Sequence, residues 1–254
     1  MEQKNNTHQF IETVRQHWFG VVLTLVGVIV VVIGLVFWVS QEREKEDKAA
    51  FLYDEAALVL VYQLPFVSTN ANMVNEISQY VLAKLDSVHR QYPQTISAMR
   101  ARLLLARLYA QSYLSQGSED SYNQALQFCD EVVRLSSRSF YRGLALINKA
   151  QLLEHHSEWQ SALDAYRTVA RKYNEFYTPY AWVSMGRVAE VMGDAKTAMT
   201  AYEMVVQKYT NSAWYGLALG RLTLIRQYGV QANTAPALGS SSSIPVLFNM
   251  ETLP

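Results

Sequence analysis

The chain has 254 residues, and its 22 lysines and arginines balance its 22 aspartates and glutamates. This balance excludes the strongly basic character of a nucleic-acid-binding protein and favours neither an acidic nor a basic partner surface. The chain has one cysteine, Cys129, so an internal disulfide cannot form, and its apolar helical surroundings indicate a core residue rather than a nucleophile.

Residues 19–39 form an uncharged stretch in which only Thr24 has a polar side chain. At about 1.5 Å per residue, a helix of this length spans ~30 Å, the thickness of the hydrocarbon core of a bilayer. Trp18 and Trp38 lie near its two ends, where aromatic rings favour the membrane interface. A cleaved signal peptide is the alternative, but the charged run over 41–48 follows in place of a small-residue cleavage site. The stretch therefore predicts an uncleaved transmembrane helix.

Four small residues of this stretch are spaced by four, three and seven positions, which places them on one side of a helix: Gly20, Thr24, Gly27 and Gly34. Small side chains permit a second transmembrane helix to approach closely, which predicts a packing face within the membrane. The alternative is that these glycines only reflect how common glycine is in transmembrane helices.

Helical segments follow one another along the rest of the chain, separated by short breaks. They are predicted at 41–64, 73–91, 95–115, 121–136, 139–156, 158–173, 177–192, 194–209 and 211–228. The sequence shows no alternation of apolar and polar residues that would indicate a strand, so the fold class is all-α. The last segment, 229–254, is rich in Ser, Ala, Gly and Pro and is predicted to be disordered. Its apolar run from Ile244 to Phe248 is either a short docking motif or a frayed end.

Several helical residues recur at a nearly constant distance. The four residues Ala150, Ala162, Tyr166 and Tyr173 return 36 positions later as Gly186, Ala198, Tyr202 and Tyr209. A period of this length is typical of stacked helix pairs, in which each pair buries its apolar face only against its neighbours.

The repeat resembles the tetratricopeptide repeat, whose first helix has the pattern W-x2-L-G-x2-Y and whose second helix has A-x3-F. The best match is Trp182-x2-Met185-Gly186-x2-Ala189, followed by Ala198-x3-Tyr202. This resemblance implies an α-solenoid whose first helices line a concave, protein-binding face. The predicted organisation is an N-terminal tail (1–18), a transmembrane helix (19–39), a tetratricopeptide-repeat-like domain (40–228) and a C-terminal tail (229–254).

The resemblance also implies a set of groove residues, since the position after the small residue of each first helix faces the concave side. The predicted groove contains Arg100, Arg107, Gln151, Glu154, Tyr180, Arg187, Glu190, Trp214 and Arg221. Arginine suits carboxylates and peptide carbonyls, and the aromatic residues supply apolar contact. The alternative interpretation is a solvated charged face on which acidic neighbours already satisfy the arginines. Under both interpretations, replacing Arg107, Arg187 and Arg221 by alanine is expected to leave the fold intact.

The sequence has no phosphate-binding glycine loop, nucleophile elbow or two-histidine zinc motif. We therefore expect no enzyme activity, no cofactor, no metal site, no nucleic acid and no small-molecule substrate. The implied partners are proteins, together with the membrane that holds the single predicted span.

The order of a short tail, one transmembrane helix and a set of repeats resembles the YfgM-like family, an ancillary subunit of the bacterial Sec translocon. Residues 10–18 before the span and the charged helix after it carry the local likeness. The resemblance implies a bacterial inner-membrane protein with a cytoplasmic N-terminus and a periplasmic repeat domain that works with translocon subunits and a periplasmic chaperone. The alternative function is a scaffold for envelope assembly or cell division.

Charge alone points to the opposite orientation. Lys4 and Arg15 precede the span, whereas Arg43, Lys45 and Lys48 follow it, and the positive-inside rule weakly favours a cytoplasmic repeat domain. A long folded domain, however, translocates largely regardless of such charge. The sequence prediction therefore follows the family resemblance and places the repeats outside.

Overall fold

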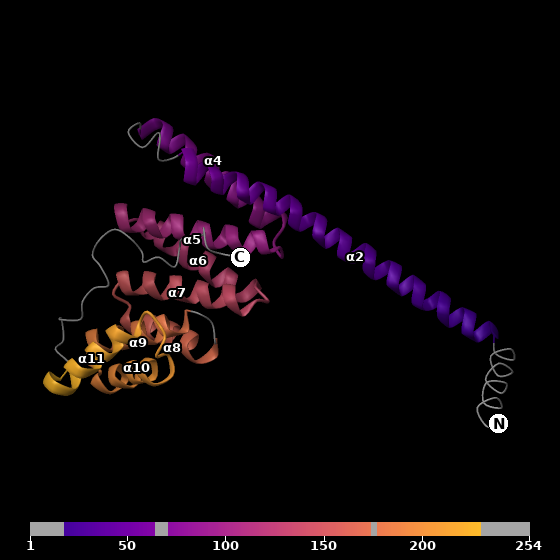
Figure 1. The fold of residues 1–254 in the computed structure, drawn as a ribbon. Helices are drawn as coiled ribbons and strands as arrows, with labels where there is room; N and C mark the ends of the chain where they lie inside the picture. The colour runs from indigo at the N-terminus through magenta and orange to yellow at the C-terminus, as the bar shows by residue number, and fades with distance from the viewer. Residues whose placement is uncertain (1–17, 64–70, 174–176, 230–254) are drawn as a thin grey trace, which may run out of the picture. The chain divides into compact units, whose positions relative to one another are not determined.

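A computed structural model describes residues 18–63, 71–173 and 177–229, and over these ranges the protein is helical without any β-strand (Figure 1). The elements are α2 (Trp18–Leu58), the π-helix η1 (Val59–Gln63), α4 (Ala71–Gln91), α5 (Ile96–Gln116), α6 (Glu119–Leu135), α7 (Ser139–His155), α8 (Trp159–Lys172), α9 (Thr178–Val191), α10 (Ala195–Lys208) and α11 (Tyr215–Tyr228). The all-α prediction is thus confirmed. Of the tails predicted over 1–18 and 229–254, residues 1–17 and 230–254 lie outside the described residues.

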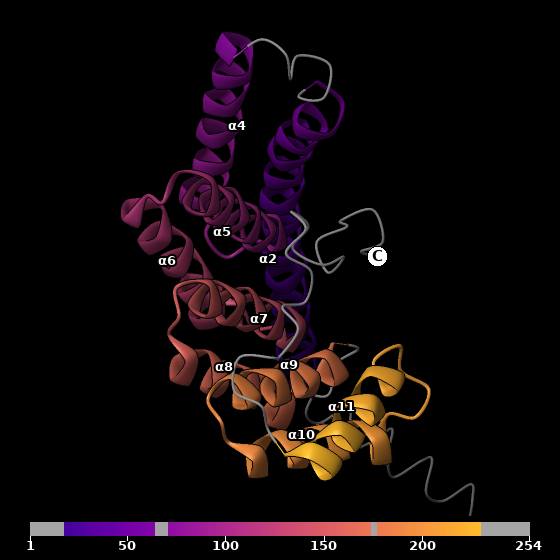
Figure 2. The ribbon, with the colours of Figure 1, turned by 90° about the vertical axis from the view of Figure 1, so that its left-hand side faces the viewer.

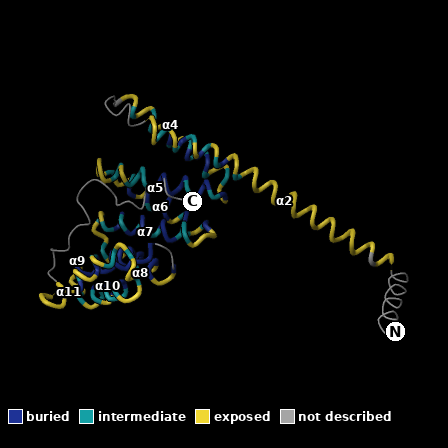
Figure 3. Tube along the Cα trace, viewed as in Figure 1, coloured by how far each residue is buried: buried dark blue, intermediate teal, exposed yellow. Residues whose placement is uncertain are grey.

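The chain forms two compact units, residues 1–98 and 99–254. In the first unit, α2 runs through the predicted span and beyond it as one helix of 41 residues (Figures 1 and 3). The sequence predicted a second helix from residue 41, but the charged residues that follow Val39 are good helix formers, and none of them interrupts the hydrogen-bond ladder. Within the described residues, this is the helix long and apolar enough to cross a membrane, and its large apolar side chains at Trp18, Phe19 and from Val22 to Val39 are exposed.

The C-terminal part of α2 forms a hairpin with α4. Ala49, Tyr53 and Ala56, spaced by four and three residues, are fully buried on α2, and Val81, Leu85 and Val88 have the same spacing and burial on α4. Such a spacing places the three side chains of each helix on one stripe, so that the two stripes pack together. The pairing is antiparallel, because Glu55 near the end of α2 accepts a hydrogen bond from Lys84 of α4 at 2.9 Å and another from the hydroxyl of Tyr80.

An acidic side chain of α2 also caps the start of α5. The carboxylate of Glu46 accepts hydrogen bonds from the backbone nitrogens of Ile96 (2.6 Å) and Ser97 (2.9 Å) and from the hydroxyl of Ser97 (2.7 Å). The first amide groups of a helix have no intrahelical acceptor, and a negative charge is favourable at this end of the helix dipole. A carboxylate fifty positions earlier in the chain therefore fixes the first turn of α5 on α2.

In the second unit, helices α6 to α11 pack successively, each against the one before it (Figures 1 and 2). A continuous apolar core runs through α7 to α11, with Ile147, Tyr166, Val188, Tyr202 and Ile225 among its buried members. Stacked helix pairs gain their stability in this way, because each pair covers the apolar face of the next. The predicted single repeat domain over 40–228 includes residues of both units and stays a prediction.

Two turns of this unit have the same geometry at positions 36 residues apart. After α7, the amide of Glu158 donates to the carbonyl of Leu153 (2.8 Å), and after α9 the amide of Asp194 donates to that of Ala189 (2.8 Å). The residue before each of these donors has a positive φ, 64° at Ser157 and 76° at Gly193. Glycine adopts this left-handed conformation without the steric cost that a Cβ atom imposes. The first turn is therefore strained and the second is not.

Replacing Ser157 with glycine is expected to raise the free energy of unfolding by about 0.5–1 kcal/mol, because the steric cost of the left-handed residue exceeds the extra entropy that glycine gives the unfolded chain. The reciprocal Gly193→Ser exchange should lower it by a similar amount. Urea titrations of the full chain in detergent micelles, followed by circular dichroism, measure both changes. A Ser157→Gly protein no more stable than the wild type would show that the turn carries no strain.

Candidate functional site: the first helices of the repeat pairs

The predicted groove residues lie on α5, α7, α9 and α11 or, for Trp214, at the residue before α11, and most of them are joined across neighbouring helices. Glu154 of α7 pairs with Arg187 of α9, and Glu190 of α9 pairs with Arg221 of α11. Gln151 of α7 donates to the hydroxyl of Tyr180 on α9 at 2.7 Å. The Tyr180 ring in turn lies 5.0 Å from the ring of Trp214. Arg100 and Arg107 are both half-buried on α5.

The acidic residue of the second pair also accepts a hydrogen bond from a tyrosine of the second helix in its own repeat pair, and a tyrosine at the equivalent position in the first pair is influenced by the charge of its glutamate. The hydroxyl of Tyr202, on α10, donates to Glu190 Oε1 at 2.5 Å. One repeat earlier, burial raises the pKa of Tyr166, on α8, well above its usual value, and the negative charge of Glu154 raises it further. Burial likewise raises the pKa of Tyr202 far above its usual range, together with the hydrogen bond to Glu190. Both tyrosines therefore remain protonated at physiological pH. Tyr202 donates to Glu190, whereas the buried hydroxyl of Tyr166 has no hydrogen-bond partner among the described residues.

We call these two sets of residues clamps: clamp 1 is Glu154, Tyr166 and Arg187, and clamp 2 is Glu190, Tyr202 and Arg221. Each clamp contains an ion pair between the first helices of two successive pairs, and in clamp 2 the hydroxyl of Tyr202 also joins the second helix to this ion pair. In clamp 2 the Arg221 guanidinium donates to both carboxylate oxygens of Glu190, one from Nε at 3.1 Å and one from Nη2. A carboxylate held by two guanidinium donors and one hydroxyl has its charge compensated although it is buried.

Several residues of the predicted groove are buried or nearly buried by the contacts within the clamps. Glu190 and Tyr180 are only 1% and 2% exposed, and the side chains of Arg187 and Arg221 are 14% and 16% exposed. Burial lowers the pKa of Arg187, but the attraction of Glu154 outweighs it, so the net shift is upward. The acidic neighbours expected under the second interpretation therefore do pair with these two arginines, within the protein rather than on a solvated face, while Arg187 Nε has no hydrogen-bond partner among the described residues. Whether the groove residues bind a partner stays a prediction.

The expectation that a triple Arg107, Arg187 and Arg221→Ala protein keeps its fold needs correction. Removal of Arg187 and Arg221 leaves the carboxylates of Glu154 and Glu190 buried without a cation, which destabilises a protein by several kcal/mol. Loss of binding in such a variant would not separate a damaged groove from a damaged fold.

A relation between neighbouring repeats accounts for the glutamine at 151 and for the arginines at 187 and 221. In α7 and in α9, a glutamate follows the groove position by three residues: Glu154 in α7 and Glu190 in α9. The next first helix then has an arginine at its own groove position, Arg187 in α9 and Arg221 in α11. The first helix before α7 has Ala110 at that place, and α7 itself has Gln151 rather than arginine. An arginine without a carboxylate would be costly at a half-buried site, whereas an amide can donate to Tyr180 instead.

The tyrosines of the clamps were missed as polar groups, because sequence reasoning treated the many tyrosines as packing residues with a polar tip. A signal for them exists in the sequence. In both repeats the tyrosine follows the glutamate by 12 residues, as in Glu154–Tyr166 and Glu190–Tyr202. The spacing acquires meaning only when a second helix is known to fold back onto the first.

Other predicted sites lie outside the stack or inside its core. The predicted packing face Gly20, Thr24, Gly27 and Gly34 is exposed on α2. Within the described part of the chain, no atom lies within 4 Å of a Cβ built on any of these three glycines. Cys129 is 2% exposed, and burial raises the pKa of its thiol to about 12, so it is a protonated core residue rather than a nucleophile.

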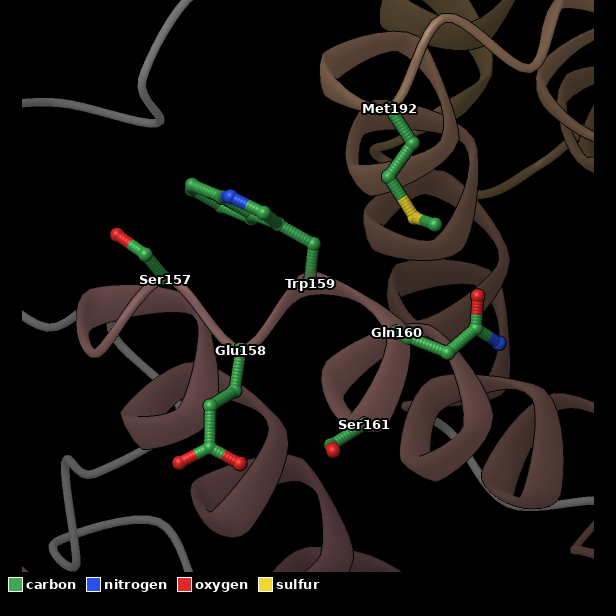
Figure 4. A pocket seen from close by; sticks show the side chains of 6 residues that line it. All are labelled: Ser157, Glu158, Trp159, Gln160, Ser161 and Met192. Carbon is green, nitrogen blue, oxygen red and sulfur yellow. The ribbon is translucent and has the colours of Figure 1, made fainter.

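An open hollow lies at the turns between the helices of successive pairs (Figure 4). It is lined by Ser157, Glu158, Trp159, Gln160, Ser161 and Met192. Glu158 is the one charged residue among those that line it, and its carboxylate already accepts a hydrogen bond from the hydroxyl of Tyr122 at 2.5 Å. The hollow thus brings no set of titratable groups together for catalysis.

The comparisons with known proteins agree with this architecture. A search of curated proteins and a search of solved structures each found no match. A family model described as a tetratricopeptide repeat-like domain matches residues 14–224, which includes α2 and nearly all of the repeat helices. Folds of this kind are typically non-catalytic scaffolds for protein interaction. The match covers well over half of the chain, and the protein therefore belongs to the tetratricopeptide repeat-like domain family.

Proposed function

We propose that this protein is a membrane-anchored scaffold of the bacterial inner membrane, an ancillary subunit that links the Sec translocon to periplasmic chaperones. The observation that carries the proposal is the combination of a candidate membrane span and a repeat stack of a protein-binding family in one chain. The resemblance to the YfgM-like family, based on the order of these elements, supplies the translocon. A scaffold for envelope assembly or cell division is the competing function.

The clamps define how such a scaffold would bind. They join three successive first helices, α7, α9 and α11, through contacts within the protein itself. The binding face is therefore ordered before a partner binds, and the entropic cost of ordering it does not weaken the affinity for that partner. The exposed side chains next to the clamps are then the ones that reach a partner. His155 is exposed directly after Glu154 on α7, whereas Thr168 is exposed on α8, the second helix of the same pair.

A photo-crosslinking residue at His155 is expected to capture translocon subunits or a periplasmic chaperone in native membranes, identified by mass spectrometry. The same residue at Thr168 is the matched control, since this position is also exposed but lies on the second helix. Equal capture from both positions would contradict a binding face on the first helices. Capture of envelope-assembly or division proteins alone would favour the competing function.

We also propose that the N-terminus is cytoplasmic and the repeat stack periplasmic. Protease added to intact spheroplasts should then digest the stack, because the folded domain lies on the outer side of the span. A matched digestion after lysis gives the cleavage expected without a membrane barrier. Full protection in intact spheroplasts would overturn this orientation and support the one that the positive-inside rule favours.

A further inference from the structure

Helix α11 has an apolar face that no other described residue of the chain covers. One side of the helix is buried in the core through Ala218, Leu222 and Ile225. The opposite side contains Gly216, Leu219, Gly220, Thr223 and Leu224, all exposed, and its C-terminal end is bordered by the exposed Arg226 and Gln227. A terminal helix of a repeat stack usually presents a polar outer face to solvent, so an apolar outer face indicates that another segment covers it.

The preceding repeat pair, α9 and α10, shows how the second helix of a pair covers the equivalent face of the first helix. Gly186 occupies the same place in α9 that Gly220 occupies in α11, and the ring of Tyr202 from α10 lies against it. A Cβ built on Gly186 would be only 2.8 Å from that ring. At Gly220 no atom of the described residues lies within 4 Å. We call the space above the backbone at this glycine position the slot. The slot at Gly186 is filled by the ring of Tyr202, whereas the slot at Gly220 is open among the described residues.

The sequence after α11 does not predict a second helix that would fill this slot in the usual way. The position equivalent to Tyr202, 34 residues later, is Pro236, and the segment around it has no helical pattern. One aromatic residue follows Tyr228, namely Phe248, in the apolar run from Ile244 to Phe248. The 14 residues from 230 to 243 can extend to roughly 45 Å, which exceeds the ~21 Å length of a 14-residue helix.

We propose that the apolar run Ile244–Phe248 docks on the outer face of α11, with the Phe248 ring in the slot at Gly220. The segment replaces the missing second helix of the last pair and covers the exposed leucines Leu219 and Leu224. Because the segment is tethered to the helix it binds, its effective concentration is in the millimolar range, and a weak intrinsic contact suffices. The docking closes the end of the stack against association through its open face.

Disulfide trapping in the full chain in detergent micelles tests the proposal. Cysteines replace Thr223 on α11 and Asn249 beside the apolar run, and the rate of disulfide formation is followed under mild oxidation. The control pairs Asn249→Cys with Thr200→Cys on α10. Thr200 and Thr223 are matched, since both are exposed and both hydroxyls donate to the carbonyl four residues earlier, at 2.9 Å. Cys129 can stay, because it is buried and its thiol is protonated.

The intramolecular disulfide at Thr223 is expected to form at least tenfold faster than the one at Thr200, and Phe248→Ala or Gly220→Glu should reduce it to the control rate. Gly220→Glu introduces a charge where the described structure has open space, so the fold tolerates it and a thermal melt verifies this. Equal rates at the two positions would overturn the proposal. A disulfide that joins two chains would also overturn it and assign the face to a second copy.

Discussion

Replacing Glu190 with alanine is expected to lower the free energy of unfolding by about 3 kcal/mol. The glutamate is almost fully buried and accepts hydrogen bonds from Tyr202 and from two nitrogens of Arg221. Its removal leaves a buried hydroxyl without an acceptor and a mostly buried guanidinium without a counter-charge. Breaking a buried pair in this way costs about 3–5 kcal/mol, and the value lies near the lower end because Arg221 can still reach some solvent.

The matched control for this prediction is Glu203→Ala. Glu203 of α10 also accepts a hydrogen bond from an arginine of α11, Arg226, at 2.6 Å, but that arginine side chain is 57% exposed. An exposed pair contributes about 0–1 kcal/mol, so the control should change stability little. Urea titration of the full chain in detergent micelles measures both variants. Equal, small losses would show that clamp 2 does not hold α9, α10 and α11 together.

Arg221→Leu combined with Glu190→Leu should recover much of the stability that Glu190→Ala loses. The double exchange removes both charges and fills the space with apolar groups, which is often neutral for a buried ion pair. Such a protein separates the contribution of the clamp to stability from its contribution to partner binding. If it is stable but no longer captures partners at the first helices, the charges serve recognition or helix position rather than stability.

The second large effect is expected at Gly186, where alanine should lower the free energy of unfolding by about 2–3 kcal/mol. A Cβ at this position lies 2.8 Å from two ring atoms of Tyr202, closer than atoms can approach. The ring cannot move aside without cost, since it is 1% exposed and its hydroxyl is bound to Glu190. Overpacking of a core by one methyl group costs about 1–3 kcal/mol, and here it also disturbs clamp 2.

Gly220→Ala in a Phe248→Ala background provides the matched control, since this glycine has the same place in α11 and its Cβ would meet open space among the described residues. Alanine in the middle of a helix is favoured over glycine by about 1 kcal/mol, so the control should be slightly more stable than its Phe248→Ala parent. Compared each with its own parent, the two variants share the gain in helix propensity and differ in the contact with the ring of Tyr202. Similar melting behaviour of the two proteins would contradict the close packing of α9 on α10.

The sequence predicted the helices well, because their signals are local. The ends of α5 to α10 lie within a few residues of those predicted, since each break has a turn-forming or capping residue such as Ser118, Gly193 or Asp194. The start of α11 was wrong by four residues. There Ser212 accepts a hydrogen bond from the amide of Trp214 at 3.2 Å, and this turn delays the helix to Tyr215.

The groove prediction shows where local signals end. Residue spacing placed Arg187, Glu154, Glu190 and Arg221 on the first helices, and this placement needed only the repeat period. It could not reveal that each arginine is bound to the glutamate of the preceding first helix, because the two partners are 31–33 residues apart and their distance depends on how the pairs stack. Burial of the charges followed from the same packing.

By itself, the sequence determined the uncharged 21-residue stretch, the helical period and the repeat, because hydrophobicity and turn chemistry act between residues close in the chain. Only the tertiary structure decided that α2 continues into a hairpin with α4, that Glu46 caps α5, and that two clamps join the first helices. These features depend on side chains 25 to 51 residues apart or on the absence of a break between two segments. Such contacts form only when packing of the apolar faces has brought the helices together, and that packing sets which polar groups must find partners inside the protein.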